Sequence, residues 1–255
     1  MSPTLISARD LELAYANGRS ALSGVSLQLG AGELVVVLGP NGGGKTTLFR
    51  ALVGELSPLA GTLEVTGTVA YLPQRDVSRT DFPVSALDVV GMGLLSERRL
   101  WARPSRSDRR RAQDALVRVG LAEQANRTYG ELSGGQRRRV LLARTIVGGA
   151  PIVLLDEPLA GVDPASAEVI DQALADLRDE GRLVIEASHD IEHARGADRV
   201  ICLSGRVIAD GDPGSALTDS ILRETYAGEI AVIRDEHGQP VLAATDSCTH
   251  DHGGD

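Results

Sequence analysis

A glycine-rich run that ends in a lysine and two threonines is the clearest chemical pattern in the chain. Residues 39–47 read GPNGGGKTT and match G-x-x-x-x-G-K-[ST], between a β-branched run at 34–38 and a helical pattern at 45–52. Glycines let such a loop curl so that several N–H groups point at one phosphate, and the helix N-terminus adds partial positive charge. The lysine can then reach the β and γ phosphates, and the first threonine can offer its hydroxyl to Mg²⁺. The residues predicted to contact a nucleotide here are Gly39, Asn41, Gly42, Gly44, Lys45, Thr46 and Thr47.

Two adjacent carboxylates follow a short apolar run later in the chain. Residues 152–155 predict a buried strand, and Asp156 and Glu157 come directly after it. Ligands of α/β proteins sit at the carboxyl edge of the parallel sheet, so both carboxylates are expected beside the phosphates. Asp156 fits the metal-side acid of a P-loop nucleotidase, and Glu157 is then placed to polarise the attacking water.

A third pattern, LSGGQ at residues 132–136, leads directly into a helical pattern. A serine and two glycines at a helix start form a second anion-binding nest. The same residues are also compatible with an ordinary helix cap, because serine is a favoured N-cap residue.

The elements that would position these motifs alternate between strands and helices, with one interruption. Apolar residues alternate with polar ones at 5–15 and 25–29, whereas from about 85 to 147 their spacing becomes 3 and 4. An α/β body interrupted by an all-helical insertion is therefore expected. The remaining predicted strands are 34–38, two within 61–72, 152–155, 183–187, 200–203 and 206–209, and the helices are 45–52, 108–119, 135–147, 164–180 and 191–195.

Composition excludes several other classes. The chain of 255 residues has 35 acidic and 26 basic side chains and a net charge of -9, which argues against attraction of the whole chain to nucleic acid. Its two cysteines, Cys202 and Cys248, form no C-x-x-C pair and indicate a reducing compartment. No secretory signal begins the chain, and no apolar run approaches the roughly 18 to 20 residues of a membrane span. Any membrane association is expected to be peripheral.

The set of motifs, in this order, resembles the ATP-binding subunit of ABC transporters over about residues 4 to 228. Further matches are Gln74 in YLPQ, Asp163 in AGVD and His189 in SHD. The resemblance implies the ABC ATPase fold, a P-loop NTPase core with an antiparallel β subdomain and an inserted all-helical subdomain. It divides the chain into residues 1–84 and 148–228 of the core and 85–147 of the helical subdomain. Beyond it, the residue pattern of 229–255 predicts a hairpin around 235–238 and a loose tail.

The resemblance also implies roles for individual residues. ATP and Mg²⁺ are the implied cofactors, with Tyr15 stacking on adenine and Gln74 touching Mg²⁺ and water. His189 would contact the γ phosphate and hold the general base. Two subunits would meet head to tail, so that the signature of one chain closes over ATP on the other. The signature residues and the acid that joins them at the nucleotide are Ser133, Gly134, Gly135, Gln136 and Asp163.

The absence of membrane spans favours an importer-type subunit on the cytoplasmic face of the cell membrane. Its partners would be a multi-span permease and, indirectly, an extracytoplasmic solute-binding protein. The glycines at 42–44, YLPQ and residues 81–93 (DFPVSALDVVGMG) look most like the zinc/manganese-type metal importers. The stretch 81–93 is also where the permease is expected to dock. A siderophore or cobalamin importer, and a soluble ABC ATPase acting on a protein assembly, remain alternatives.

The end of the chain carries its own ligand pattern. Cys248, His250 and His252 form C-x-H-x-H, which offers a thiolate and imidazoles suited to Zn²⁺. The competing interpretation is a disordered polar end.

Overall fold

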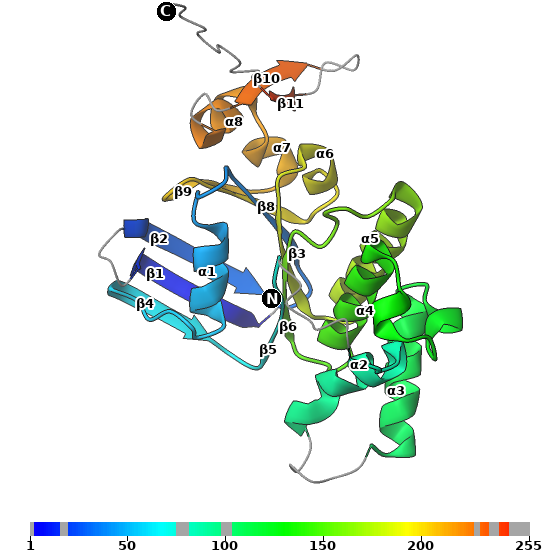
Figure 1. Ribbon diagram of the computed structural model, residues 1–255. Coiled ribbons are helices and arrows are strands. Elements are labelled where there is room, and N and C mark those ends of the chain that lie inside the picture. Colours follow the sequence, from blue (N-terminus) through cyan, green and yellow to red (C-terminus); the bar gives the residue numbers. More distant parts are fainter. Residues whose placement is uncertain are drawn as a thin grey trace, which may run out of the picture.

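The computed structural model describes residues 3–15, 20–74, 82–97, 104–226, 230–234 and 240–244. Its centre is a six-stranded sheet in the order β5-β6-β7-β3-β8-β9 (Figure 1). All neighbours in it are parallel except β8 and β9. The strands are β3 (Leu34–Leu38), β5 (Val69–Leu72), β6 (Ile152–Asp156), β7 (Leu183–Ser188), β8 (Arg199–Leu203) and β9 (Val207–Gly211).

Three adjacent interior strands, β6, β7 and β3, explain why distant motifs meet. Every residue of β3, β6 and β7 is buried, as expected for apolar, β-branched strands covered on both faces. Their carboxyl ends are in register, since Leu38 pairs with Ser188 and Asp156 pairs with Ala187. The glycine-rich loop, the two carboxylates and His189 therefore leave the sheet side by side.

A separate antiparallel sheet in the order β2-β1-β4 covers one side of the core. It is built from β1 (Thr4–Ala14), β2 (Ser20–Gly30) and β4 (Ala60–Val65). Helix α1 (Lys45–Leu52) lies between the two sheets (Figure 1), and its Leu48 and Phe49 share a core with Val35 and Val37 of β3. The sequence predicted that β2 begins at residue 25, and this boundary is wrong. Gly24, with φ +63°, interrupts the alternation of apolar and polar residues where the pairing of β2 with β1 shifts in register.

Residues 86–146 carry helices on the other side of the central sheet (Figure 1). They are α2 (Ala86–Gly91), a 3-10 turn at Met92–Glu97, α3 (Arg106–Arg118), 3-10 turns at Ala122–Gln124 and Tyr129–Glu131, and α4 (Gly134–Ile146). Each α-helix begins with a capping box, in which a serine and the side chain three residues later bond each other's backbone N–H. Ser105 caps α3, so the predicted start at residue 108 was two residues late.

The last part of the chain returns to the sheet and then adds helices of its own. Helix α5 (Pro164–Asp179) precedes β7, and α6 (Ile191–Ala194) follows it. Helices α7 (Pro213–Ala216) and α8 (Asp219–Tyr226) were not predicted, and strands β10 (Ile230–Arg234) and β11 (Pro240–Ala244) pair as an antiparallel hairpin. Among the described residues, no helix combines the length and hydrophobicity that a membrane span requires.

Candidate active site

The loop between β3 and α1 forms one wall of a pocket of about 490 Å³. Its backbone needs glycine, because Gly42 and Gly44 have φ of +78° and +103°. A Cβ on Gly44 would also collide with the side chain of Leu22. The pocket is lined by Tyr15, Ser20, Ala21, Pro40, Asn41, Gly42, Gly44, Lys45, Thr46, Thr47, Gln74, Asp156, Glu157 and Gly205.

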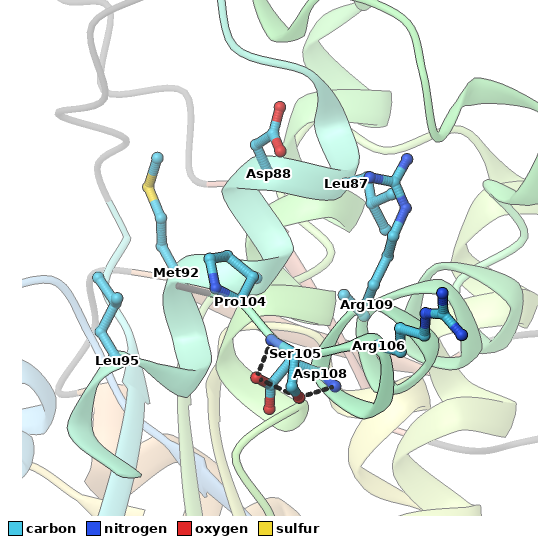
Figure 2. Close-up of a pocket in the computed structure, with 11 residues that line it drawn as sticks. Leu87, Asp88, Met92, Leu95, Pro104, Ser105, Arg106, Asp108 and Arg109 are labelled. Carbon is cyan, nitrogen blue, oxygen red and sulfur yellow. Dashed lines mark hydrogen bonds between the residues drawn. The ribbon is translucent and has the colours of Figure 1, made fainter. Parts of the chain in front are cut away.

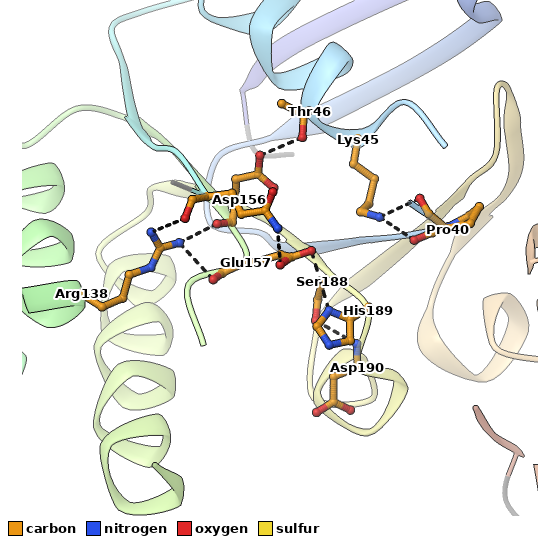
Figure 3. A network of polar contacts seen from close by, with 11 residues as sticks. Pro40, Lys45, Thr46, Arg138, Asp156, Glu157, Ser188, His189 and Asp190 are labelled. Atoms are coloured by element: carbon orange, nitrogen blue, oxygen red, sulfur yellow. Dashed lines mark hydrogen bonds and ion pairs between the residues drawn. The ribbon is translucent and has the colours of Figure 1, made fainter. Parts of the chain in front are cut away.

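Lys45 places its ammonium group inside the curl of this loop (Figure 3). Its Nζ donates to the carbonyl of Gly39 at 2.5 Å and to that of Pro40 at 3.1 Å. Burial lowers the pKa of Lys45, while the charges of Glu157 and Asp156 act in the opposite direction. The cation is thus held next to the loop whose N–H groups would receive phosphate.

Asp156 forms the acidic counterpart across the pocket. Thr46 Oγ1 donates to Asp156 Oδ2 at 2.9 Å, and the hydroxyl of Tyr71 approaches the same oxygen at 3.5 Å. Asp156 is 2% exposed, and burial raises its pKa. Burial and the charge of Asp156 also raise the pKa of Tyr71 to about 12. A carboxylate and a hydroxyl converging in this way are the oxygen ligands that Mg²⁺ prefers, so the residues fit the metal that the motifs imply.

Glu157 lies close to the two other predicted catalytic side chains, and Figure 3 shows His189 beside it. Gln74 Nε2 donates to Glu157 Oε2 at 2.6 Å, and Nδ1 of His189 lies 3.8 Å from Glu157 Oε1. Glu157 has φ +52°, a left-handed conformation that is uncommon for a residue with a side chain. Its N–H donates to the carbonyl of Ala187 at 3.0 Å. The structure therefore brings Gln74, Glu157 and His189 together. Their roles toward Mg²⁺, water and the γ phosphate stay predictions.

One arginine near this site was missed by the sequence analysis. Arg138 on α4 donates from Nη1 to the carbonyls of Pro73 and Gln74, at 2.8 and 3.2 Å. Its Nη2 donates to the carbonyls of Asp156 and Glu157, at 2.6 and 3.0 Å. It stands in a run of three arginines, RRR, which resembles a solvated helix face, so no local signal marks it.

Tyr15 lies at the edge of the pocket and is 40% exposed. Its hydroxyl is hydrogen-bonded to Thr47 Oγ1 at 2.5 Å, which fixes the ring beside the start of α1. This placement is compatible with the predicted stacking on adenine, and the stacking itself stays a prediction.

The signature residues are apart from this pocket. Among the described residues that line it, none comes from 133–136. Ser133 is the N-cap of α4, and a Cβ on Gly134 or Gly135 would meet open space. Asp163 caps α5 by accepting from the N–H of Ser166, and hydrogen bonds from the side chain and the backbone of Ser166 lower its pKa. The predicted tail ligands Cys248, His250 and His252 lie outside the described residues.

The fold and this pocket together define a P-loop nucleotide hydrolase with an inserted helical subdomain. The family model described as ABC transporter matches residues 22–160. The manganese transport system ATP-binding protein of Bacillus subtilis is 37% identical, over 86% of this chain and 91% of that protein. The zinc transport system ATP-binding protein of Treponema pallidum is also 37% identical, over 87% of this chain and 86% of that protein.

Solved structures give the same result. A structure of an ABC transporter assigned to the metal-chelate type superposes with a TM-score of 0.81 at 27% identity, over 96% of this chain and 99% of that one. A dimeric ATP-binding cassette with bound ADP and Pi superposes with a TM-score of 0.71 at 27% identity, over 82% of this chain and 99% of that one. The chain belongs to the ABC transporter family, and it is an ATP-hydrolysing subunit of that family.

Proposed function

We propose that the chain is the motor subunit of an importer for a divalent metal ion, zinc or manganese. The observation that carries the catalytic part is the cluster in which Gln74 and His189 flank Glu157, next to Asp156 and Lys45. The metal part is supported by the relatives that match most of the chain, which are named as manganese and zinc transport proteins.

In the proposed mechanism, Lys45 binds the β and γ phosphates as a point charge, and the glycine-rich loop supplies N–H donors. Thr46 and Asp156, with Gln74, would hold Mg²⁺, which when bound offsets negative charge on those phosphates. Glu157 accepts a proton from the attacking water as general base. His189 lies 3.8 Å from the Glu157 carboxylate and holds it in position while contacting the γ phosphate.

The active form is proposed to be a head-to-tail dimer of two copies. The signature at 133–136 is displaced from the pocket of its own chain, so it is available to a nucleotide on another chain. The N-terminus of α4 would supply N–H groups to that nucleotide. A solved cassette at 27% identity is a dimer, which supports this arrangement.

The permease is proposed to dock in a groove between α2 and α3 (Figure 2). Leu87, Met92 and Leu95 line its apolar part, and Met92 and Leu95 are 43% and 59% exposed. Arg106 and Arg109 stand at its rim. A short amphipathic helix of the permease fits such a groove, because its apolar face covers the floor and its polar face meets the rim. The chain so docked is proposed to lie at the cytoplasmic face of the membrane, with a solute-binding protein acting on the opposite side.

The groove is tested by Leu95→Asp, with Val117→Asp as its control. The two side chains are equally exposed, at 59% and 60%, but Val117 on α3 is not among the residues that line the groove. Leu95→Asp is expected to abolish stimulation of ATP hydrolysis by the permease and to leave the basal rate of the free subunit unchanged. Equal loss of stimulation in both variants would argue against this docking site.

Transport is tested by assembling the chain with its permease in vesicles and following ATP-driven movement of zinc, manganese, a ferric siderophore and cobalamin. Movement of zinc or manganese that Lys45→Ala abolishes is the expected result. Movement of the siderophore or cobalamin instead would select the alternative importer class. If the chain associates with no permease and a soluble protein assembly stimulates its ATP hydrolysis, the alternative of a soluble ABC ATPase is supported.

A further inference from the structure

We propose that Arg138 is a positioning residue that connects the signature helix to the catalytic segments of its own chain and thereby couples the two nucleotide sites of the dimer. The inference rests on the proposed function, because it needs the shared sites of a head-to-tail dimer. It goes beyond that function by naming the contacts through which closure at one nucleotide site changes the geometry of the other.

The contacts of Arg138 reach two separate catalytic segments at once. Its guanidinium group is turned away from solvent, with the residue 9% exposed, and it donates to four main-chain carbonyls. Figure 3 shows the bonds to Asp156 and Glu157. Two belong to Pro73 and Gln74, and two belong to Asp156 and Glu157. The planar guanidinium has five donors in a fixed fork, so it holds these two segments in one geometry.

Arg138 acts on a residue whose backbone conformation needs support. The left-handed conformation of Glu157, with φ +52°, persists only where its surroundings enforce it. The peptide groups on its two sides are held by different elements: its N–H by Ala187 of β7, and its carbonyl by Arg138 of α4. The direction of the Glu157 carboxylate therefore depends on the position of α4 relative to β7.

The same helix begins at the signature. Ser133 caps α4 and Arg138 follows five residues later, about 7.5 Å along a helix that rises about 1.5 Å per residue. In the proposed dimer, Ser133 contacts ATP on the other chain, whereas Gln74 and Glu157 act on ATP of their own chain. Movement of α4 on closure over one nucleotide is thus passed by Arg138 to the residues that hydrolyse the other.

The neighbouring arginines make contacts of a different kind. Arg137 donates to the carbonyl of Leu132, and Arg139 donates to that of Val119, at 2.8 and 3.0 Å. Both acceptors lie within the helical insertion, so neither bond links α4 to the central sheet. Arg111 is similar, since it joins α3 to the carbonyl of Val147 at 3.0 Å. It provides a matched control that loses a carbonyl contact without touching the catalytic segments.

The test compares Arg138→Gln, Arg138→Lys and Arg111→Gln in the assembled transporter, by measuring ATP affinity, kcat and the Hill coefficient for ATP. Arg138→Gln is expected to lower kcat about 10- to 100-fold, as small misplacements of catalytic groups do. Its Hill coefficient should fall toward 1, with ATP affinity changed less than about twofold, since Arg138 does not line the nucleotide pocket. Arg138→Lys keeps the charge but not the fork, so an intermediate loss is expected.

A wild-type kcat and Hill coefficient in Arg138→Gln would overturn the proposal, and so would equal losses in Arg111→Gln. If Arg138→Gln does not fold, Arg138→Lys decides: an intermediate kcat and Hill coefficient support the coupling, and wild-type values overturn it. Failure of the proposed function is recognised separately, because then the unaltered chain itself shows no hydrolysis stimulated by its permease.

Discussion

Replacing His193 by leucine is expected to lower the free energy of unfolding by about 3–5 kcal/mol, because the change leaves a buried carboxylate without its cation. Glu186 on β7 is 1% exposed, and its Oε2 lies 2.8 Å from Nε2 of His193 on α6. Asp171 on α5 approaches the other ring nitrogen of His193 at 3.6 Å. The pair therefore fastens α6 and α5 to the strand that ends just before His189.

Two comparisons of unfolding free energy distinguish a buried ion pair from an ordinary surface ion pair. Changing both Glu186 and His193 to leucine is expected to be close to neutral or stabilising, since no unpaired charge is then buried. Arg195→Leu, at the C-cap of the same helix, is the control. Its 2.9 Å pair with Glu192 has side chains 27% and 56% exposed and contributes about 0–1 kcal/mol.

The pair also sets a pH dependence. Burial alone would lower the pKa of His193, but the hydrogen bond and charge of Glu186, with the charges of Asp171 and Asp190, raise it to about 9. An unfolded histidine has a pKa of about 6.5, so this contribution is fully present below about pH 6.5 and is lost as the pH rises through about 9. At about 1.36 kcal/mol per pKa unit, the loss of unfolding free energy is at most about 3–4 kcal/mol.

Urea unfolding followed by circular dichroism, at pH values from about 6 to about 9, measures these differences. The unaltered chain should lose stability relative to the double leucine variant across that range, and His193→Leu alone should be the least stable protein throughout. A cost below about 1 kcal/mol for His193→Leu, or one equal to that of Arg195→Leu, would refute the buried-pair reasoning.

Three further predictions concern the nucleotide pocket. Gly44→Ala should weaken ATP binding at least about tenfold in a titration, because φ +103° and the neighbouring Leu22 oppose a Cβ there; unchanged affinity would contradict this role for the loop. Tyr71→Phe removes a donor to the Asp156 carboxylate and should raise the Mg²⁺ concentration for half-maximal hydrolysis about fivefold, the equivalent of one hydrogen bond. Lys45→Ala and Ser133→Arg should each abolish hydrolysis, and mixing them should restore part of it; no recovery would argue against head-to-tail sharing.

The residues of the site that could be predicted are those whose signal is local. The glycine-rich loop, Asp156 and Glu157 are contiguous with the strands that carry them, so the pattern of strand, motif and helix was sufficient. Gln74 and His189 were assigned by family resemblance. His189 was expected beside the general base, whereas the hydrogen bond from Gln74 to Glu157 was not predicted. How these residues act on ATP stays a prediction.

Arg138 could not be predicted, because its role depends on how α4 is rotated against a sheet edge that is distant in sequence. Glu186 and His193 were missed for a related reason, because their pairing depends on how α6 packs against β7. The sequence of the strand, LVIEAS, does not indicate which histidine pairs with its glutamate. Helices α7 and α8 were also missed. They are short, with four and eight residues, and their formation depends on packing of Ala216, Leu222 and Tyr226 against the core.

The most direct test of the catalytic assignment is ATP turnover by Glu157→Gln. The variant keeps the size of the side chain and its place between Gln74 and His189, but an amide cannot accept a proton from water. ATP binding should remain intact, turnover should fall on the order of 10²-fold or more, and an ATP-bound dimer should accumulate. Hydrolysis by Glu157→Gln at the rate of the unaltered chain would contradict the account, because some other group would then have to activate the water.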